Sequence, residues 1–335
     1  MGKYTIKEIA KMAGVSPTAV SFVINNKNGV SAKTREKVSK VIESTNFKPS
    51  FNSMRLFFKK SYNISIIIKQ TSSPFNDLFY FEIAKGLLDK SKEFGYNIVF
   101  SDISLEGNNV ILPEIINRND TDGIIFLQDT DKTILNEIDK RNIPYVVVDT
   151  HSPNNDFTCI TGDYLLSSFT ATKYLISKGH KNIAFIGSSY IPDYYHQAFT
   201  GYKNALEETN MSIPPSWIQI DAFDEASSYK CMERILKSRT IPSAVFCSGD
   251  LFAISAIKCA KDNGYKVPED ISFIAVDDIL LSRYIEPKLT TVKIDKEKMG
   301  SLAMELIIKK INNEQVDSII VESDNIIERD SVFKK

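Results

Sequence analysis

The amino-acid sequence predicts an all-α helix-turn-helix head followed by an α/β body of two lobes, each built on a doubly wound parallel sheet. Residues 5–25 read as two short helices around a glycine turn, and residues 61–335 alternate short apolar runs with helical stretches. Such alternation is typical of parallel sheets covered by helices. The first 60 residues carry 12 Lys and Arg against 3 Asp and Glu, whereas the remaining 275 carry 29 against 39. A basic module on an acidic body is typical of nucleic-acid binders.

The helix-turn-helix pattern begins at Thr5, which can cap a first helix, and Glu8 completes a capping box. Gly14 ends that helix, Ser16 can cap the second, and Pro17 occupies a first helical position, where its missing N–H costs nothing. In DNA-binding units of this kind, the N-terminal residues of the second helix meet base edges in the major groove. The positions expected to face outward are Thr18, Ala19, Ser21 and Phe22.

A third helix is expected over residues 32–45, capped by Ser31. Residues 50–61 mix small, basic and apolar side chains without a clear buried face, so they read as a hinge or as an ordinary linker. In the body, strands are expected at 63–69, 96–101, 122–128, 143–149, 182–187, 217–221, 243–247 and 271–277. Helices are expected at 81–95, 110–118, 132–141, 164–179, 196–208, 225–237, 251–264 and 296–312.

Composition excludes several classes of protein. No run of about 18 apolar residues is present, and the N-terminus lacks the basic start and apolar stretch of a signal peptide, so we expect a cytoplasmic protein. The cysteines show neither CxxC spacing nor neighbouring histidines, which predicts reduced core thiols and no metal or other cofactor. They are Cys159, Cys231, Cys247 and Cys259.

Three motifs, TIKEIAKMAGVSP at 5–17, SAKTREKV at 31–38 and FKPS at 47–50, resemble the lactose-repressor (LacI/GalR) family of bacterial transcription regulators. The resemblance implies a periplasmic-binding-protein-like body whose last helix returns to the first lobe. It also implies a hinge that folds on operator DNA, with Leu56 wedged into the minor groove. The expected divisions are a head at 1–48, a hinge at 49–60 and a body at 61–335, with a first lobe of about 61–161 plus 293–320 and a second of about 162–292 plus 321–335.

Ligands of open parallel sheets collect at the carboxyl ends of the strands, which in this body means between the lobes. Asp149, Asp250 and Asp277 stand at or just after strand ends and could accept hydrogen bonds from an effector, although each could instead cap a helix. The resemblance adds Phe75 and Phe223, which could stack on the effector or pack in the protein. It implies a sugar or a sugar phosphate as effector.

Two of the departures from the family pattern affect the predicted contacts most directly. Ala198 stands where an arginine is common, which removes the strongest generic contact for a sugar or a carboxylate and makes a corepressor more plausible. Phe22 also replaces an arginine and can offer only apolar contact with a thymine methyl group. The predicted DNA contacts are Thr5, Ser16, Pro17, Thr18, Ser21, Phe22, Asn25, Ser31, Thr34 and Leu56.

The leading prediction is therefore a homodimeric, sequence-specific repressor of a sugar-utilisation operon that binds a palindromic operator and responds to an effector between its lobes. A regulator that acts with a small-molecule or protein corepressor is the alternative. A Rossmann-type enzyme with a DNA-binding head is disfavoured, because GxGxxG after the first strand, GxxxxGK[ST] and GxSxG are all missing. A transported-solute binding protein would need an exported N-terminus.

Overall fold

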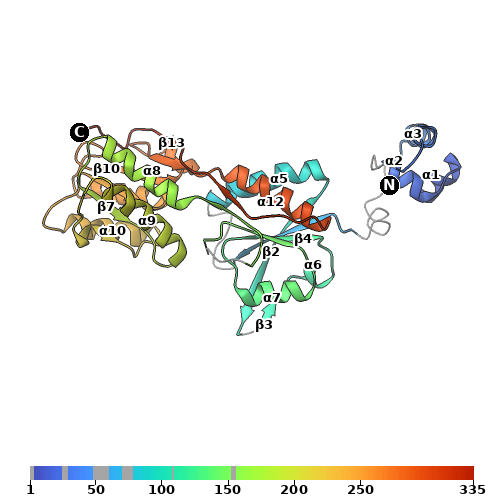
Figure 1. The fold of residues 1–335 in the computed structure, drawn as a ribbon, viewed down its shortest axis with the longest axis horizontal. Coiled ribbons are helices and arrows are strands. Elements are labelled where there is room, and N and C mark those ends of the chain that lie inside the picture. Colours follow the sequence, from blue (N-terminus) through green and yellow to red (C-terminus); the bar gives the residue numbers. More distant parts are fainter. Residues whose placement is uncertain (1–3, 25–28, 48–59, 70–77, 108, 152–155) are drawn as a thin grey trace. The chain divides into compact units, whose positions relative to one another are not determined.

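The computed structural model describes residues 4–24, 29–47, 60–69, 78–107, 109–151 and 156–335 (Figure 1). The chain forms two compact units. One comprises Met1–Tyr62 with Asn119–Asp122, and the other comprises Asn63–Arg118 with Gly123–Lys335. Four predicted positions or segments, namely Asn25, the hinge, Leu56 and Phe75, lie wholly or mainly outside the described residues.

The first unit carries the helices α1 (Ile6–Ala13), α2 (Pro17–Ile24) and α3 (Ala32–Thr45). The predicted capping box is confirmed: Thr5 Oγ1 accepts from the Glu8 amide at 3.3 Å, and Glu8 Oε2 accepts from the Thr5 amide at 2.6 Å. Gly14 ends α1 with φ +66°, in the left-handed region that glycine adopts readily. The buried side chains that join the three helices are Ile6, Ile9, Ala10, Ala13, Val20, Val38 and Phe47.

The first lobe of the body is a seven-stranded sheet in the order β12-β6-β5-β4-β1-β2-β3. Its strands are β1 (Asn63–Lys69), β2 (Asn97–Glu106), β3 (Asn109–Ile111), β4 (Gly123–Leu127), β5 (Tyr145–Val148), β6 (Cys159–Gly162) and β12 (Ile319–Val321), and its helices are α5 (Leu78–Phe94), α6 (Glu114–Asn117), α7 (Lys132–Lys140) and α12 (Lys296–Ile311). All pairs are parallel except β2 with β3. Every residue of β4 and β5 is buried, as helices on both faces of a parallel sheet require.

One expected helix is wrong. Residues 110–118 were expected to be helical, but Val110 and Ile111 belong to β3, which pairs antiparallel with the end of β2. Only Glu114–Asn117 forms a helix. Pro113 explains the difference, because a proline disfavours helical backbone in the residue before it and favours a helix start after it.

The second lobe is a six-stranded sheet in the order β13-β11-β10-β9-β7-β8, parallel except where β13 joins β11. Its strands are β7 (Ile183–Ile186), β8 (Ile218–Gln219), β9 (Ala244–Cys247), β10 (Ser272–Asp277), β11 (Thr290–Lys293) and β13 (Ile326–Ile327). Its helices are α8 (Tyr164–Ser177), α9 (Pro192–Glu207), α10 (Glu225–Leu236) and α11 (Asp250–Asp262), with short 3-10 turns η1 (Pro215–Trp217) and η2 (Leu280–Arg283).

The chain returns to the first lobe through α12, which lies beside α5 (Figure 1). Two glycines permit this close packing. A Cβ at Gly86 would lie 2.1 Å from the Glu297 carbonyl oxygen, and a Cβ at Gly300 would lie 2.1 Å from that of Ile83. Side chains at either position would push the helices apart.

Three of the four cysteines are buried, and Cys159 is partly exposed. In the part of the chain that the structure describes, no helix has both the length and the apolar character needed to cross a membrane.

Candidate ligand cavity and nucleic-acid interface

The start of α2 presents the small polar surface that a major-groove reader needs. Ser16 and Thr18 are exposed, and Pro17 and Phe22 are partly exposed. The Ser16 hydroxyl accepts from the Ala19 amide at 3.2 Å, so Ser16 caps the helix as predicted. Elsewhere in the head, Thr5 and Ser31 are exposed and Thr34 is partly exposed.

The prediction that Ser21 faces outward is wrong, because its side chain is only 1% exposed. Helical spacing gives the reason. Ser21 follows the buried Val20 and precedes Ile24 by three positions, and both of these side chains belong to the core of the head. Phe22 has a structural contact as well: a Cβ at Gly29 would lie 2.8 Å from Phe22 Cε2, so the ring packs over the turn that leads to α3.

The described head also carries exposed positive charge. The exposed lysines of the described head are Lys7, Lys11, Lys33, Lys37 and Lys40. Cations of this kind neutralise DNA phosphates and release counterions, which supplies affinity without sequence selectivity.

The body holds a cavity of about 210 Å³ at the carboxyl ends of strands from both sheets. Aromatic side chains dominate its wall, and two carboxylates, Asp149 and Asp277, lie among them. The lining residues are Leu78, Phe79, Tyr80, Asp149, His151, Tyr164, Ile191, Tyr194, Phe223, Gly249, Leu251, Phe252, Asp277 and Ile279. Three of the five predicted effector positions therefore line one cavity.

Asp149 follows β5 and is 4% exposed. Its carboxylate accepts a hydrogen bond from the Tyr80 hydroxyl at 2.5 Å and a second from the Tyr164 hydroxyl. Tyr80 belongs to α5 of the first lobe and Tyr164 begins α8 of the second, so this carboxylate ties the two lobes together. Burial and the Asp149 charge raise the pKa of Tyr164 well above its usual value. The phenol therefore remains a donor.

Asp277 ends β10 and is partly exposed to the cavity. Burial raises its pKa well above the ordinary value, and the Asp250 carboxylate nearby raises it further. Both cavity carboxylates also stand at unusual backbone angles, with φ +61° at Asp149 and +129° at Asp277. Non-glycine residues seldom adopt such angles, and where they do, they cluster at functional sites.

Asp250 does not line the cavity, contrary to the expectation that it contacts the effector. Its neighbours Gly249 and Leu251 do line the cavity. Its Oδ2 accepts from the Ile279 amide at 2.9 Å and from the Ser282 hydroxyl at 2.5 Å, and its Oδ1 accepts from the Thr291 hydroxyl at 2.5 Å. Nor does Asp250 cap a helix, since Gly249 is the N-cap of α11. The carboxylate instead joins α11 to η2 and β11.

At the cavity wall, Phe223 is 57% exposed and packs edge-to-face against Tyr190 with ring centroids 4.9 Å apart. Its ring is therefore accessible for stacking on a ligand, which is one of the two roles predicted for it.

Among the lining residues that the sequence did not predict are four with polar groups, namely Tyr80, His151, Tyr164 and Tyr194. The rings of His151, Tyr164 and Tyr194 contact one another, with centroids 4.9 to 5.0 Å apart. His151 Nε2 lies 3.8 Å from Asp149 Oδ2, and within the described residues its buried Nδ1 has no hydrogen-bond partner. His151 stands two residues after a strand-end aspartate, which is a signal that could have found it.

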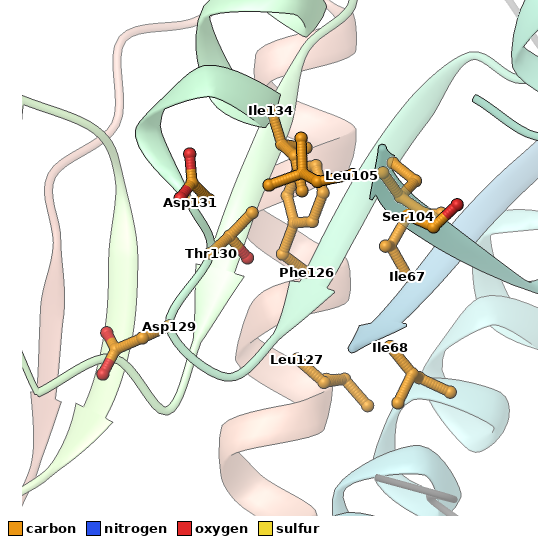
Figure 2. A pocket seen from close by; sticks show the side chains of 11 residues that line it. Ile67, Ile68, Ser104, Leu105, Phe126, Leu127, Asp129, Thr130, Asp131 and Ile134 are labelled. Atoms are coloured by element: carbon orange, nitrogen blue, oxygen red, sulfur yellow. The ribbon is translucent and has the colours of Figure 1, made fainter. Parts of the chain in front are cut away.

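A second cavity of about 430 Å³ lies within the first lobe (Figure 2). Its walls are mainly apolar, as the side chains of Leu105, Phe126 and Ile134 show. The Asp129 carboxylate at its edge already accepts from the Thr150 hydroxyl and the His151 amide. We assign the smaller cavity as the candidate ligand site, because specific ligand sites combine apolar walls with a few convergent polar groups.

Comparison with known proteins agrees with this architecture. Residues 5–50 match the family model described as bacterial regulatory proteins, lacI family, and residues 172–332 match that of a periplasmic binding protein-like domain. Among solved structures, the lac repressor dimer bound to operator and the anti-inducer ONPF is similar with a TM-score of 0.74, at 21% identity, over 98% of this chain and 99% of that one. The transcriptional regulator CelR–cellobiose complex is similar with a TM-score of 0.72, at 24% identity, over 98% and 100%.

Two relatives carry the assignment by sequence. The HTH-type transcriptional repressor PurR of Pasteurella multocida is 33% identical over 328 residues, which cover 95% of each chain. Catabolite control protein A of Priestia megaterium is 33% identical over 328 residues, which cover 97% of each chain. The predicted resemblance is thus confirmed: the chain belongs to the lacI family of bacterial regulatory proteins and is a DNA-binding transcriptional repressor, not an enzyme.

Proposed function

We propose that this repressor binds a palindromic operator as a homodimer in the cytoplasm, and that a small molecule in the cavity of Asp149, Asp277 and Phe223 controls its affinity for the operator. The observation that carries the proposal is that both lobes contribute to the cavity wall. Tyr80 of the first lobe and Tyr164 of the second both donate a hydrogen bond to the Asp149 carboxylate. A ligand at this point would alter how the lobes are held.

Two similar structures support both parts of the proposal. One is a lac repressor dimer bound to operator and an anti-inducer, and the other is a transcriptional regulator in complex with cellobiose. By analogy, we propose an effector-responsive dimer and a sugar-utilisation operon as target. Coupling between ligand and operator would be worth about 1–3 kcal/mol, or roughly 5- to 150-fold in operator affinity.

Within the head, we propose that Ser16, Pro17 and Thr18 meet base edges, with phosphate contacts from the surrounding polar and basic side chains. We retain Asn25 and the Leu56 wedge as proposals from the sequence. The divisions at 1–48, 49–60 and 61–335 are proposed as the head, the hinge and the body with its two lobes.

The test uses full-length protein and duplexes recovered by selection from random DNA. Thr18→Ala should weaken binding to the selected operator at least 5-fold, because one base contact is lost, while affinity for unrelated DNA stays the same. Lys203→Ala, an exposed change on α9, is the control. Equal affinity of wild type and Thr18→Ala for the operator would remove the start of α2 from the interface.

The dimer is tested with the same DNA. Halving the palindrome should reduce affinity by far more than a factor of two, because only one head can then bind. An effector that lowers operator affinity makes the protein an inducible repressor. One that raises it selects the alternative, corepression. Undiminished binding to a half-site would contradict the dimer.

A further inference from the structure

The charge balance of the cavity is one-sided. Of the described residues that line it, none is a lysine or an arginine, while Asp149 and Asp277 are both present. A third carboxylate, that of Asp250, lies directly behind, and the Asp250 amide is 3.4 Å from Asp277 Oδ2. Three carboxylates thus lie close together at a site whose wall is otherwise mainly aromatic and aliphatic.

The cations nearby are already engaged. Lys296 is 1% exposed, and its ammonium donates to the carbonyl oxygens of Asp277, Asp278 and Ile294 and lies 3.3 Å from Glu82 Oε2. The Lys296 charge lowers the pKa of Asp277, but burial and the Asp250 charge each raise that pKa by more. Lys296 does not itself line the cavity.

Two arginines are engaged in the same way. Arg329 and Arg283 both pair with the Asp278 carboxylate, the latter at 3.3 Å. Neither guanidinium group lines the cavity. A phosphate or carboxylate group of a ligand would therefore meet no lysine or arginine among the described lining residues, and it would lie close to the side chains of Asp149 and Asp277, whose negative charge repels anions.

The aromatic wall favours a different ligand. The electron-rich faces of aromatic rings attract cations and pack against flat or ring-shaped molecules. Asp277 has an oxygen available for a ligand: within the described residues its side chain accepts only the long bond from the Asp250 amide. A ligand that donates an N–H or O–H would relieve the cost of its charge.

We propose that this cavity binds a non-anionic, ring-shaped ligand that donates N–H or O–H groups to Asp277, and that it excludes phosphorylated and carboxylated molecules. The inference rests on the proposed effector site and narrows its ligand, since it removes the sugar phosphates from the candidates. An unphosphorylated sugar, an amino sugar or a nitrogen heterocycle satisfies it.

The decisive experiment measures the charge of the cavity in full-length protein with Phe223→Trp as probe. The natural Trp217 is 3% exposed, so an indole at the exposed position 223 dominates collisional quenching. The measured quantity is the ratio of the caesium quenching constant to the iodide quenching constant, at pH 8 and constant ionic strength. For the indole at position 223 this ratio should be at least 2-fold higher than for free N-acetyltryptophanamide. Adding Asp277→Asn should reduce that ratio, whereas Asp262→Asn, an exposed change distant in sequence on α11, should not.

Matched ligands provide the second measurement. Calorimetric titrations compare D-glucose, D-glucosamine and D-glucose 6-phosphate, and adenosine with adenosine monophosphate. Whichever ring binds, its unphosphorylated form should bind at least 10-fold more tightly. The inference is overturned if a phosphorylated form binds as tightly as its unphosphorylated form or more tightly, and if the Phe223→Trp variant loses that binding, which places it in this cavity.

If none of these ligands binds, the quenching measurement alone tests the inference. Iodide quenching that equals or exceeds caesium quenching, relative to the free indole, overturns it. The proposed function fails separately, if no ligand that occupies the cavity changes operator affinity.

Discussion

Replacing Asp250 by alanine should destabilise the second lobe strongly. The side chain is fully buried and accepts from three donors, the Ile279 amide and the hydroxyls of Ser282 and Thr291. Alanine would leave these donors without an acceptor and would leave a small void. The prediction separates a structural carboxylate from one that contacts the effector.

The magnitude follows from the contacts. A buried donor left unsatisfied costs about 1–3 kcal/mol. The two hydroxyls can rotate toward other acceptors, but the Ile279 amide cannot. The buried carboxylate also carries a cost of its own, since burial raises the pKa of Asp250. We therefore expect a net loss of about 3 kcal/mol in the free energy of unfolding, near the lower end of the summed cost of three unsatisfied donors.

Urea unfolding followed by Trp217 fluorescence measures this loss. Trp217 is the single tryptophan, is buried in the second lobe, and so reports on the lobe that holds Asp250. With a slope of about 2 kcal/mol per molar urea, the midpoint should fall by roughly 1.5 M. Asp262→Ala, on the exposed face of the same helix, should leave the midpoint unchanged. A shift below about 0.5 M for Asp250→Ala would refute the structural role.

Three further predictions concern the head, the packing of the second lobe and pH. Ser16→Ala removes the cap of α2 and should cost about 1 kcal/mol in the unfolding of the head, measured by circular dichroism. Gly201→Ala would place a Cβ 2.3 Å from the Leu165 carbonyl oxygen, so α8 and α9 must separate at a cost of about 1–3 kcal/mol; an unchanged urea midpoint would contradict this packing. Because the folded pKa of Asp277 is raised, wild-type stability should fall as pH rises above the ordinary carboxyl value, and Asp277→Asn should lose this dependence; parallel melting curves from pH 4 to 8 would count against it.

Local patterns were sufficient for much of the fold. The caps at Thr5 and Ser16 depend on hydrogen bonds between residues three apart, so the sequence shows them directly. The buried runs of β4 and β5 were equally clear, since a strand covered on both faces must be apolar throughout. The expected helix at 110–118 is wrong, because Pro113 disfavours helical backbone before it, although the apolar spacing of the segment is helical.

The sequence by itself determined the head, the two strand-helix series and the family, because periodicity, caps and motifs are local properties of the chain. It also placed Asp149, Asp250 and Asp277 at one edge of the sheets. Only the tertiary structure decided that Asp149 and Asp277 face the cavity and Asp250 does not. The partners of Asp250 lie 29, 32 and 41 residues away, so their hydrogen bonds exist only after the chain has folded.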